Sequence, residues 1–105
     1  MAGRRSLALL GLLLTLVLAV PDGAVLFQQH CVGCHVNGGN IIRRNKTLRL
    51  AALERNGIVD AAAISAIAAD GLGSMGGYRE VLGPGGADAV GGWVWQQAQA
   101  GWPRG

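Results

Sequence analysis

Two thiols and an imidazole fall within five neighbouring positions of this 105-residue chain, in the segment Cys31-Val32-Gly33-Cys34-His35. The spacing C-x-x-C-H is the pattern of c-type haem attachment. Two thiols about one helical turn apart can each bond a vinyl group of the same porphyrin, and the adjacent imidazole can reach the iron from one side. The segment therefore predicts that the rest of the chain folds around one covalently bound haem c.

Three other uses of the two cysteines remain open, and each meets a difficulty. A structural zinc site needs four ligands, yet the only further Cys or His is His30, directly beside Cys31 and badly placed to complete a tetrahedron. A thioredoxin-like dithiol would need the pair at a helix start within a βαβ pattern, which this sequence lacks. A simple disulfide would leave His35 without a role.

Met75 is the candidate for the second axial ligand of the haem iron, opposite His35. It is the only methionine besides Met1 and stands among Gly73, Gly76 and Gly77, in a segment that can wrap to the far face of a porphyrin. Ligation by Met and His raises the potential of a haem for electron transfer. Methionine often fills gaps in a core instead, but Met75 belongs to no helical stripe. His30 is a weaker rival ligand, expected to point to solvent or to cap its helix.

The N-terminus indicates an export signal. Arg4 and Arg5 precede an uncharged run of 14 residues from Leu7 to Val20, and this order is typical of a secretory signal. At about 1.5 Å per residue, such a run is shorter than the ~30 Å hydrocarbon layer. We expect a signal peptide over residues 1–19, cleaved after Ala19, and one domain over residues 20–105. An uncleaved anchor is the alternative, and the mature form should have no stable membrane span.

The charge balance excludes some functions. Nine basic and six acidic residues give +3, and without Arg4 and Arg5 the balance is 7 − 6 = +1. A nucleic-acid binder needs a basic stripe or face, so no nucleic-acid partner is expected. The one basic cluster, Arg43-Arg44 and Lys46, is expected at the surface, where it can meet haem propionates or an acidic partner.

Local patterns predict an all-α domain, since apolar residues recur at helical spacing and none alternate with period two. Capping residues and glycines mark the ends of the helices. The segment Gly71 to Gly77 should be irregular. The acidic side chains fall at helix starts, ends or exposed faces, so no catalytic acid or base is expected. The expected helices run from Asp22 to about Cys34, from Thr47 to Asn56-Gly57, from Asp60 to Gly71, and from Gly83-Pro84 through Gln97.

The chain has few bulky side chains from which to build a core. Phe27, Tyr78 and three tryptophans are its only aromatic residues, whereas glycine occurs 18 times. A haem buries roughly several hundred Å² of apolar surface, worth on the order of ten kcal/mol at about 25 cal/mol/Å² before entropy costs. The cofactor would replace much of the missing core, so we expect the apoprotein to be largely unfolded.

Several short segments along residues 20–105 together match one known family. They are Gly23-Ala24-Val25-Leu26-Phe27, Cys31 to His35, the loop at Asn40, Lys46-Thr47-Leu48 with Ala52-Leu53-Glu54, Gly71 to Met75 with Tyr78, Val90 and Trp93-Val94, and Gly101-Trp102. These segments resemble the class I cytochromes c, specifically the photosynthetic cytochrome c6 group (also called cytochrome c553) and its c6-like relatives. The resemblance implies a small fold of about four helices around one covalent haem c.

By this resemblance, the protein is a soluble one-electron carrier and not an enzyme. It would be a monomer in the thylakoid lumen or the bacterial periplasm, shuttling between the cytochrome b6f complex and photosystem I or a terminal oxidase. Gly23 and Phe27 should cross the last helix at Trp93. The alternative function is a haem-based sensor or peroxidase-like protein in which Met75 dissociates and opens the iron to a small ligand.

Three positions depart from the family pattern. Met75-Gly76 replaces the usual Met-Pro, which removes a rigid residue and should make the methionine loop more mobile. Ile67 stands where ordinary members carry a glutamine near the haem, as in the c6-like branch, and predicts a lower reduction potential. Val81 replaces an arginine thought to aid docking on photosystem I, with Arg79 two positions earlier, so the choice of partner is open.

Overall fold

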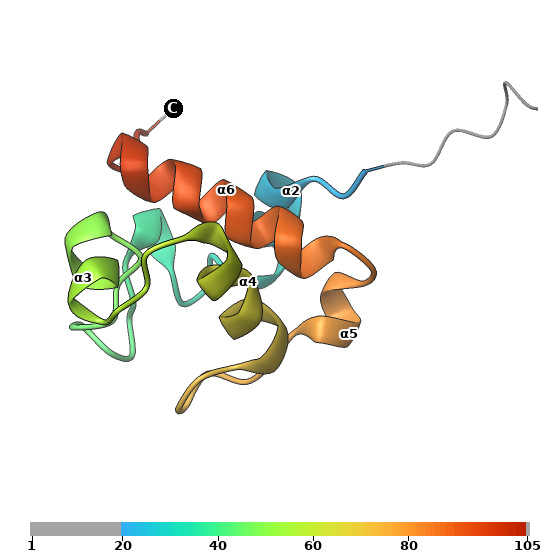
Figure 1. Ribbon diagram of the computed structural model, residues 1–105, viewed down its shortest axis with the longest axis horizontal. Coiled ribbons are helices and arrows are strands. Elements are labelled where there is room, and N and C mark those ends of the chain that lie inside the picture. The colour runs from blue at the N-terminus through green and yellow to red at the C-terminus, as the bar shows by residue number, and fades with distance from the viewer. Residues whose placement is uncertain (1–19, 105) are drawn as a thin grey trace, which may run out of the picture.

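The computed structural model describes residues 20–104, and this part of the chain is all-helical (Figure 1). The predicted signal peptide, residues 1–19, lies outside the described residues. Within residues 20–104 no helix has the length and apolar character needed to cross a bilayer. The helices are α2 (Gly23–His30), the 3-10 turn η1 (Val36–Gly38), α3 (Leu50–Arg55), α4 (Ala61–Asp70), α5 (Arg79–Leu82) and α6 (Gly86–Ala100).

Two of the predicted helix caps are confirmed. The Asp22 carboxylate accepts hydrogen bonds from the first backbone N–H groups of α2, at 3.0 and 3.2 Å. The Asp60 carboxylate accepts from Ala63 N at 2.8 Å at the start of α4. Such bonds satisfy N–H groups that have no partner within the helix. Gly71 ends α4 as predicted, with φ of +82°.

The first helix is shorter than predicted, because it ends at His30 and not near Cys34. The N–H groups of Cys31 and Val32 both donate to the Phe27 carbonyl, at 2.8 and 3.0 Å, and the second bond spans five residues, so the turn widens there instead of continuing the helical pattern. The two thiols and His35 consequently lie in a separate turn after the helix. This turn is closed by the N–H groups of Cys34 and His35, which both donate to Cys31 O.

The predicted starts of two other helices were also wrong. Thr47 Oγ1 accepts from Arg49 N at 3.4 Å, but α3 begins only at Leu50. The last helix begins at Gly86, with Gly85 as its N-cap, and not at Gly83-Pro84. The four residues of α5 lie in between, an element too short for its periodicity to be recognised.

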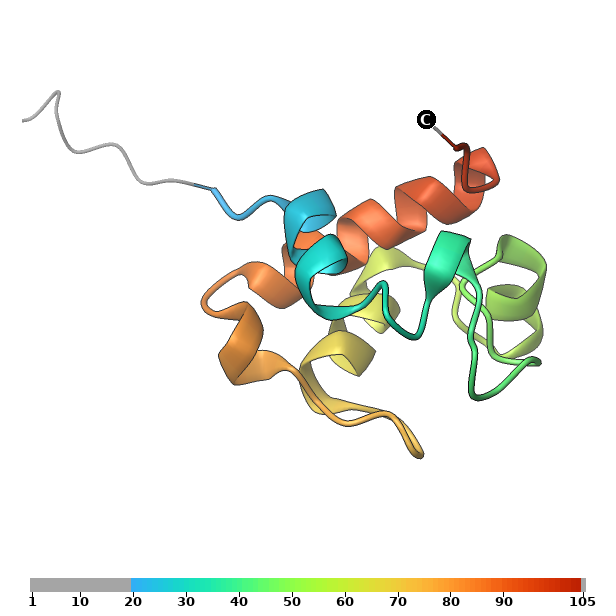
Figure 2. The same ribbon diagram turned by 180° about the vertical axis from the view of Figure 1, so that it is seen from behind.

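The core forms where α6 packs against α2 and α4, and the α4–α6 contact is the more extensive of the two. Figures 1 and 2 show α3 and α5 at opposite ends of the molecule, with α6 running along one side. The predicted crossing of α2 and α6 is confirmed, since a Cβ on Gly23 would overlap the carbonyl oxygen of Ala89. Phe27 lies in the same crossing, with its ring centroid 5.0 Å from that of Trp93.

Candidate haem site

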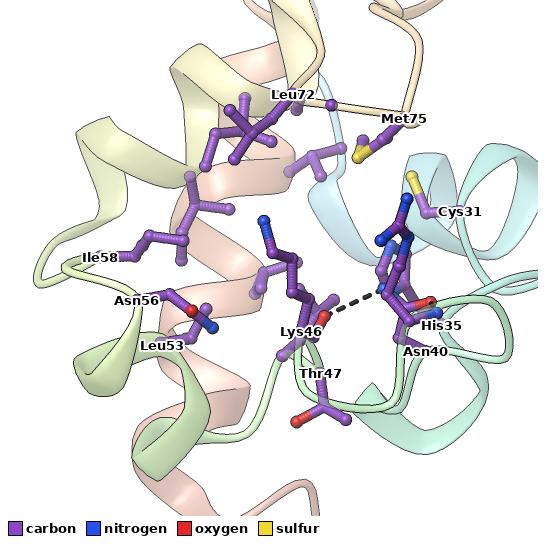
Figure 3. Close-up of a pocket in the computed structure, with 18 of the residues that line it drawn as sticks. Cys31, His35, Asn40, Lys46, Thr47, Leu53, Asn56, Ile58, Leu72 and Met75 are labelled. Carbon is purple, nitrogen blue, oxygen red and sulfur yellow. Dashed lines mark hydrogen bonds between the residues drawn. The ribbon is translucent and has the colours of Figure 1, made fainter.

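One apolar pocket brings together segments that are far apart in the sequence (Figure 3). The turn after α2 and the loop that follows it line the pocket, together with residues of α3, α4, α6 and the methionine loop. The lining residues are Phe27, Cys31, His35, Asn40, Arg43, Lys46, Thr47, Leu48, Leu53, Asn56, Ile58, Ile64, Ile67, Ala68, Leu72, Gly73, Ser74, Met75, Val90 and Val94.

The half-buried ring of His35 is oriented by the backbone. Its Nδ1 lies 2.7 Å from the carbonyl oxygen of Gly39. Because a carbonyl oxygen only accepts hydrogen bonds, this contact assigns the ring proton to Nδ1 and leaves the lone pair of Nε2 free. A backbone carbonyl in this position fixes the tautomer and raises the basicity of the ring as a metal ligand.

Met75 sits in a short hairpin that projects from the end of α4 (Figure 2). Leu72 N donates to Met75 O at 2.9 Å and Met75 N donates to Leu72 O at 3.0 Å. This pair forms the isolated bridge of a segment that otherwise lacks regular structure, as the sequence predicted. The half-buried Met75 side chain presents its sulfur on the same side of the pocket as the sulfur of Cys31 (Figure 3).

The two cysteines differ in their surroundings. Cys31 is half-buried and lines the pocket, and burial raises the pKa of its thiol. Cys34 is exposed and is not among the lining residues. Both thiols are free, so they form no disulfide with each other. Of the four predicted site residues, the structure therefore brings Cys31, His35 and Met75 to one pocket and places Cys34 outside its lining.

The polar part of the pocket comes mainly from the loop after His35. The Asn40 amide oxygen accepts from Ile42 N and Arg43 N at 3.0 and 2.8 Å, and its nitrogen donates to Lys46 O at 3.0 Å. These bonds order the predicted basic cluster, in which Arg43 and Lys46 line the pocket while Arg44 is exposed outside it. Lys46 extends its amine into the pocket (Figure 3).

The apolar wall includes Ile67, as expected for a residue near the haem. His30 is half-buried and does not line the pocket, in keeping with its weaker candidacy as a ligand. Asn56 was expected only as a helix stop, yet it lines the pocket and donates to Ala52 O at 2.9 Å and to Asn45 O at 3.2 Å. The bond to Asn45 O joins the end of α3 to the loop that carries the basic cluster. No local sequence pattern indicates this bond.

The pocket fits a haem by the chemistry of its donors. A thiol, an imidazole with its Nε2 free and a thioether meet in a largely apolar space, and basic side chains at the same pocket can meet the propionates. With α2 crossing α6 and a distant methionine loop after α4, these features define a class I cytochrome c.

Comparisons with known proteins narrow this class. A family model described as cytochrome C oxidase, cbb3-type, subunit III matches residues 18–94. A cytochrome c6-like protein of Nostoc sp. (strain PCC 7120) is 40% identical over 77% of this chain and 73% of its own length. Cytochrome c6 of Aphanizomenon flos-aquae is 39% identical over 79% of this chain and 95% of its own length. The crystal structure of cytochrome c6B from Synechococcus sp. WH8102 has 55% identity and a TM-score of 0.78, covering 84% of this chain and all of that one.

The chain belongs to the cytochrome c6 family, as a c6-like member. Members of this family carry electrons in photosynthesis and are not enzymes. The protein is therefore a haem c electron carrier.

Proposed function

We propose that this protein transfers single electrons through one haem c, bound covalently by Cys31 and Cys34 and held axially by His35 and Met75. The haem supplies the one-electron redox centre. The observation that carries the proposal is that Cys31, His35 and Met75 line one pocket although Met75 comes from a distant segment. Cys34 lies three residues after Cys31 in the same hydrogen-bonded turn, so a porphyrin over the pocket can meet both thiols at its edge.

Neighbouring residues orient the two proposed iron ligands and determine the polarity around them. The Gly39 carbonyl keeps Nε2 of His35 free for the iron, and the hairpin bonds between Leu72 and Met75 hold the backbone that carries the thioether. With His35 and Met75 already placed at one pocket, a bound haem iron would change its charge with little rearrangement of the chain. The apolar Ile67 offers no hydrogen bond that could draw electron density from the Met75 sulfur.

We also propose that the basic segment from residue 43 to residue 55 is the docking surface for an acidic membrane partner. Five basic side chains and one acidic side chain, Glu54, occur there, and all six are exposed. The contact of Asn56 with Asn45 O joins the loop to the end of α3, so these charges lie on neighbouring surfaces. Such a field speeds encounter with an acidic surface. The basic residues are Arg43, Arg44, Lys46, Arg49 and Arg55.

The partners that fit this proposal are the cytochrome b6f complex as donor and photosystem I or a terminal oxidase as acceptor. The chain would be exported by residues 1–19 and would act as a monomer in the thylakoid lumen or the periplasm. What supports this is its membership of the cytochrome c6 family and the leader pattern of Arg4-Arg5 and the apolar run after them.

The test is the mass and visible spectrum of the exported, matured protein. We expect the mass of one haem added to the polypeptide from residue 20 onward, and colour that stays with the polypeptide in acid–acetone. The oxidised protein should show the weak sulfur-to-iron absorption band, and Met75→Ala should abolish it. A polypeptide without an added tetrapyrrole would overturn the proposal, and a haem that washes out in acid–acetone would overturn covalent attachment.

A further inference from the structure

The indole of Trp102 is held in a defined place at the C-terminal end of the fold. Trp102 follows the end of α6 with φ of +54°, a conformation uncommon for a residue other than glycine. Its backbone N–H donates to Gln97 O at 2.8 Å. Only 9% of the residue is exposed. Its ring centroid lies 5.6 Å from that of Phe27 and 5.7 Å from that of Trp93. A backbone in this region persists where surrounding contacts hold it.

The same indole contacts the loop that follows His35. Its Nε1 donates to Leu48 O at 2.9 Å, and Leu48 N donates to Gly38 O at 2.7 Å. A Cβ built on Gly38 would stand only 2.5 Å from the indole Cδ2 atom. Gly38 also has φ of +79°, so only glycine fits between the indole and the turn. The ring therefore lies flush against the backbone of this loop.

This backbone is the one that orients His35. Gly39, whose carbonyl accepts from His35 Nδ1 at 2.7 Å, is the neighbour of Gly38, and Gly38 N in turn donates to His35 O at 3.1 Å. A continuous set of contacts thus leads from the C-terminal indole, through Leu48 and Gly38, to the acceptor of the histidine ring. Trp102 itself does not line the pocket.

We propose that Trp102 is a positioning residue for His35: it holds the Gly38-Gly39 peptide in place, and so keeps the Gly39 carbonyl at bonding distance from Nδ1. The inference rests on the proposed role of His35 as an iron ligand. The hydrogen bond that Nδ1–H donates to the Gly39 carbonyl makes the imidazole a stronger electron donor to iron, and a stronger electron donor favours the more highly charged ferric iron. Trp102 therefore lowers the reduction potential through a residue it does not touch.

The test compares two variants of the mature holoprotein. Trp102→Phe keeps an aromatic ring but loses the donor to Leu48 O, whereas Trp93→Phe alters the same aromatic cluster without touching the loop. We expect Trp102→Phe to raise the reduction potential and to speed solvent exchange of the His35 Nδ1 proton, measured by NMR. Trp93→Phe should leave both at their wild-type values. Equal values in all three proteins, or equal changes in the two variants, would overturn the inference.

A measurement on the wild type covers the case in which Trp102→Phe does not fold. Coupling between two sites is reciprocal, so the redox state of the iron should alter the exchange rate of the Trp102 indole proton and leave that of Trp93 unchanged. Identical exchange of the Trp102 proton in both redox states would overturn the inference. Failure of the proposed function would show differently, as a wild-type spectrum without His and Met ligation.

Discussion

Gly91 of α6 lies against Ser65 of α4 so closely that a Cβ on Gly91 would overlap the Ser65 hydroxyl oxygen and come within 2.8 Å of Ala61 O. Ser65 is buried, and its hydroxyl donates to Ala61 O at 3.0 Å. The two helices that form the back of the pocket therefore meet at a point with no spare space. Neither atom is the flexible end of a long side chain, so the helices themselves would have to separate to admit a methyl group.

We predict that Gly91→Ala destabilises the holoprotein by about 1–3 kcal/mol, the range for overpacking a tight contact. Denaturant unfolding followed by circular dichroism measures this. Gly92→Ala is the matched control, because a Cβ there meets nothing within 4 Å and alanine favours a helix by up to about 1 kcal/mol over glycine. If Gly91→Ala is at least as stable as the wild type, as Gly92→Ala is expected to be, then α4 and α6 do not approach each other so closely.

Ile67 is the position at which the pocket should tune the potential. A glutamine there can donate a hydrogen bond to the Met75 sulfur and weaken it as a donor to ferric iron, so Ile67→Gln should raise the reduction potential. A hydrogen bond worth about 0.5–1.5 kcal/mol corresponds to roughly 20–60 mV for one electron. Redox titration measures the shift, and Ile67→Leu, which stays apolar, should leave the potential unchanged. An unchanged or lower potential in Ile67→Gln would contradict this role.

Much of the fold follows from signals that act over a few residues. Asp22 and Asp60 could be recognised as caps because each side chain bonds N–H groups two or three positions further on. The end of α2 could not be recognised. Phe27 O accepts two N–H groups there, and no residue type in the sequence distinguishes this arrangement from a continuing helix. Gly85 as a cap depends on α5, which is itself too short to carry a pattern.

The candidate site also has one part that the sequence predicts and another part that it does not. The C-x-x-C-H spacing and a single distant methionine were enough to predict Cys31, His35 and Met75, which the structure brings to one pocket. The bond from Trp102 to Leu48 O spans 54 residues, and no spacing rule connects two such positions. His35 Nδ1 donates to a backbone carbonyl. Every residue has such a carbonyl, so the sequence does not show which one accepts the bond.

Arg44 offers a test of the docking surface, because it is exposed and does not line the pocket. Reversing its charge should slow electron transfer to a membrane partner by roughly two- to tenfold at low salt, because we propose that this surface docks on an acidic one. Arg104→Glu is the matched control, with the same change of charge near the C-terminus. Flash photolysis with isolated photosystem I measures the rate. An equal slowing by both variants would indicate an effect of net charge alone.

Removal of the cofactor should unfold most of the chain. The helices pack around a pocket whose walls are apolar side chains such as Ile64, Ile67 and Leu53, and exposing such surface costs about 25 cal/mol per Å². The double variant Cys31→Ser with Cys34→Ser, produced without haem, should show little helical circular dichroism and no cooperative melting. A cooperatively melting form with native helix content would show that the protein part alone is stable.

The hairpin bonds between Leu72 and Met75 restrain the backbone of the proposed iron ligand, whereas the flexible Gly76 after it would ease its departure from the iron. Carbon monoxide separates these outcomes, because it binds reduced haem only where an axial position opens. We expect the reduced protein at neutral pH to resist carbon monoxide, and Met75→Ala to bind it promptly, as recorded in the visible spectrum. Gly76→Ala, in which the added Cβ meets nothing within 4 Å, should resist carbon monoxide as the wild type does. Prompt, tight binding by the wild type would instead support a sensor whose methionine dissociates.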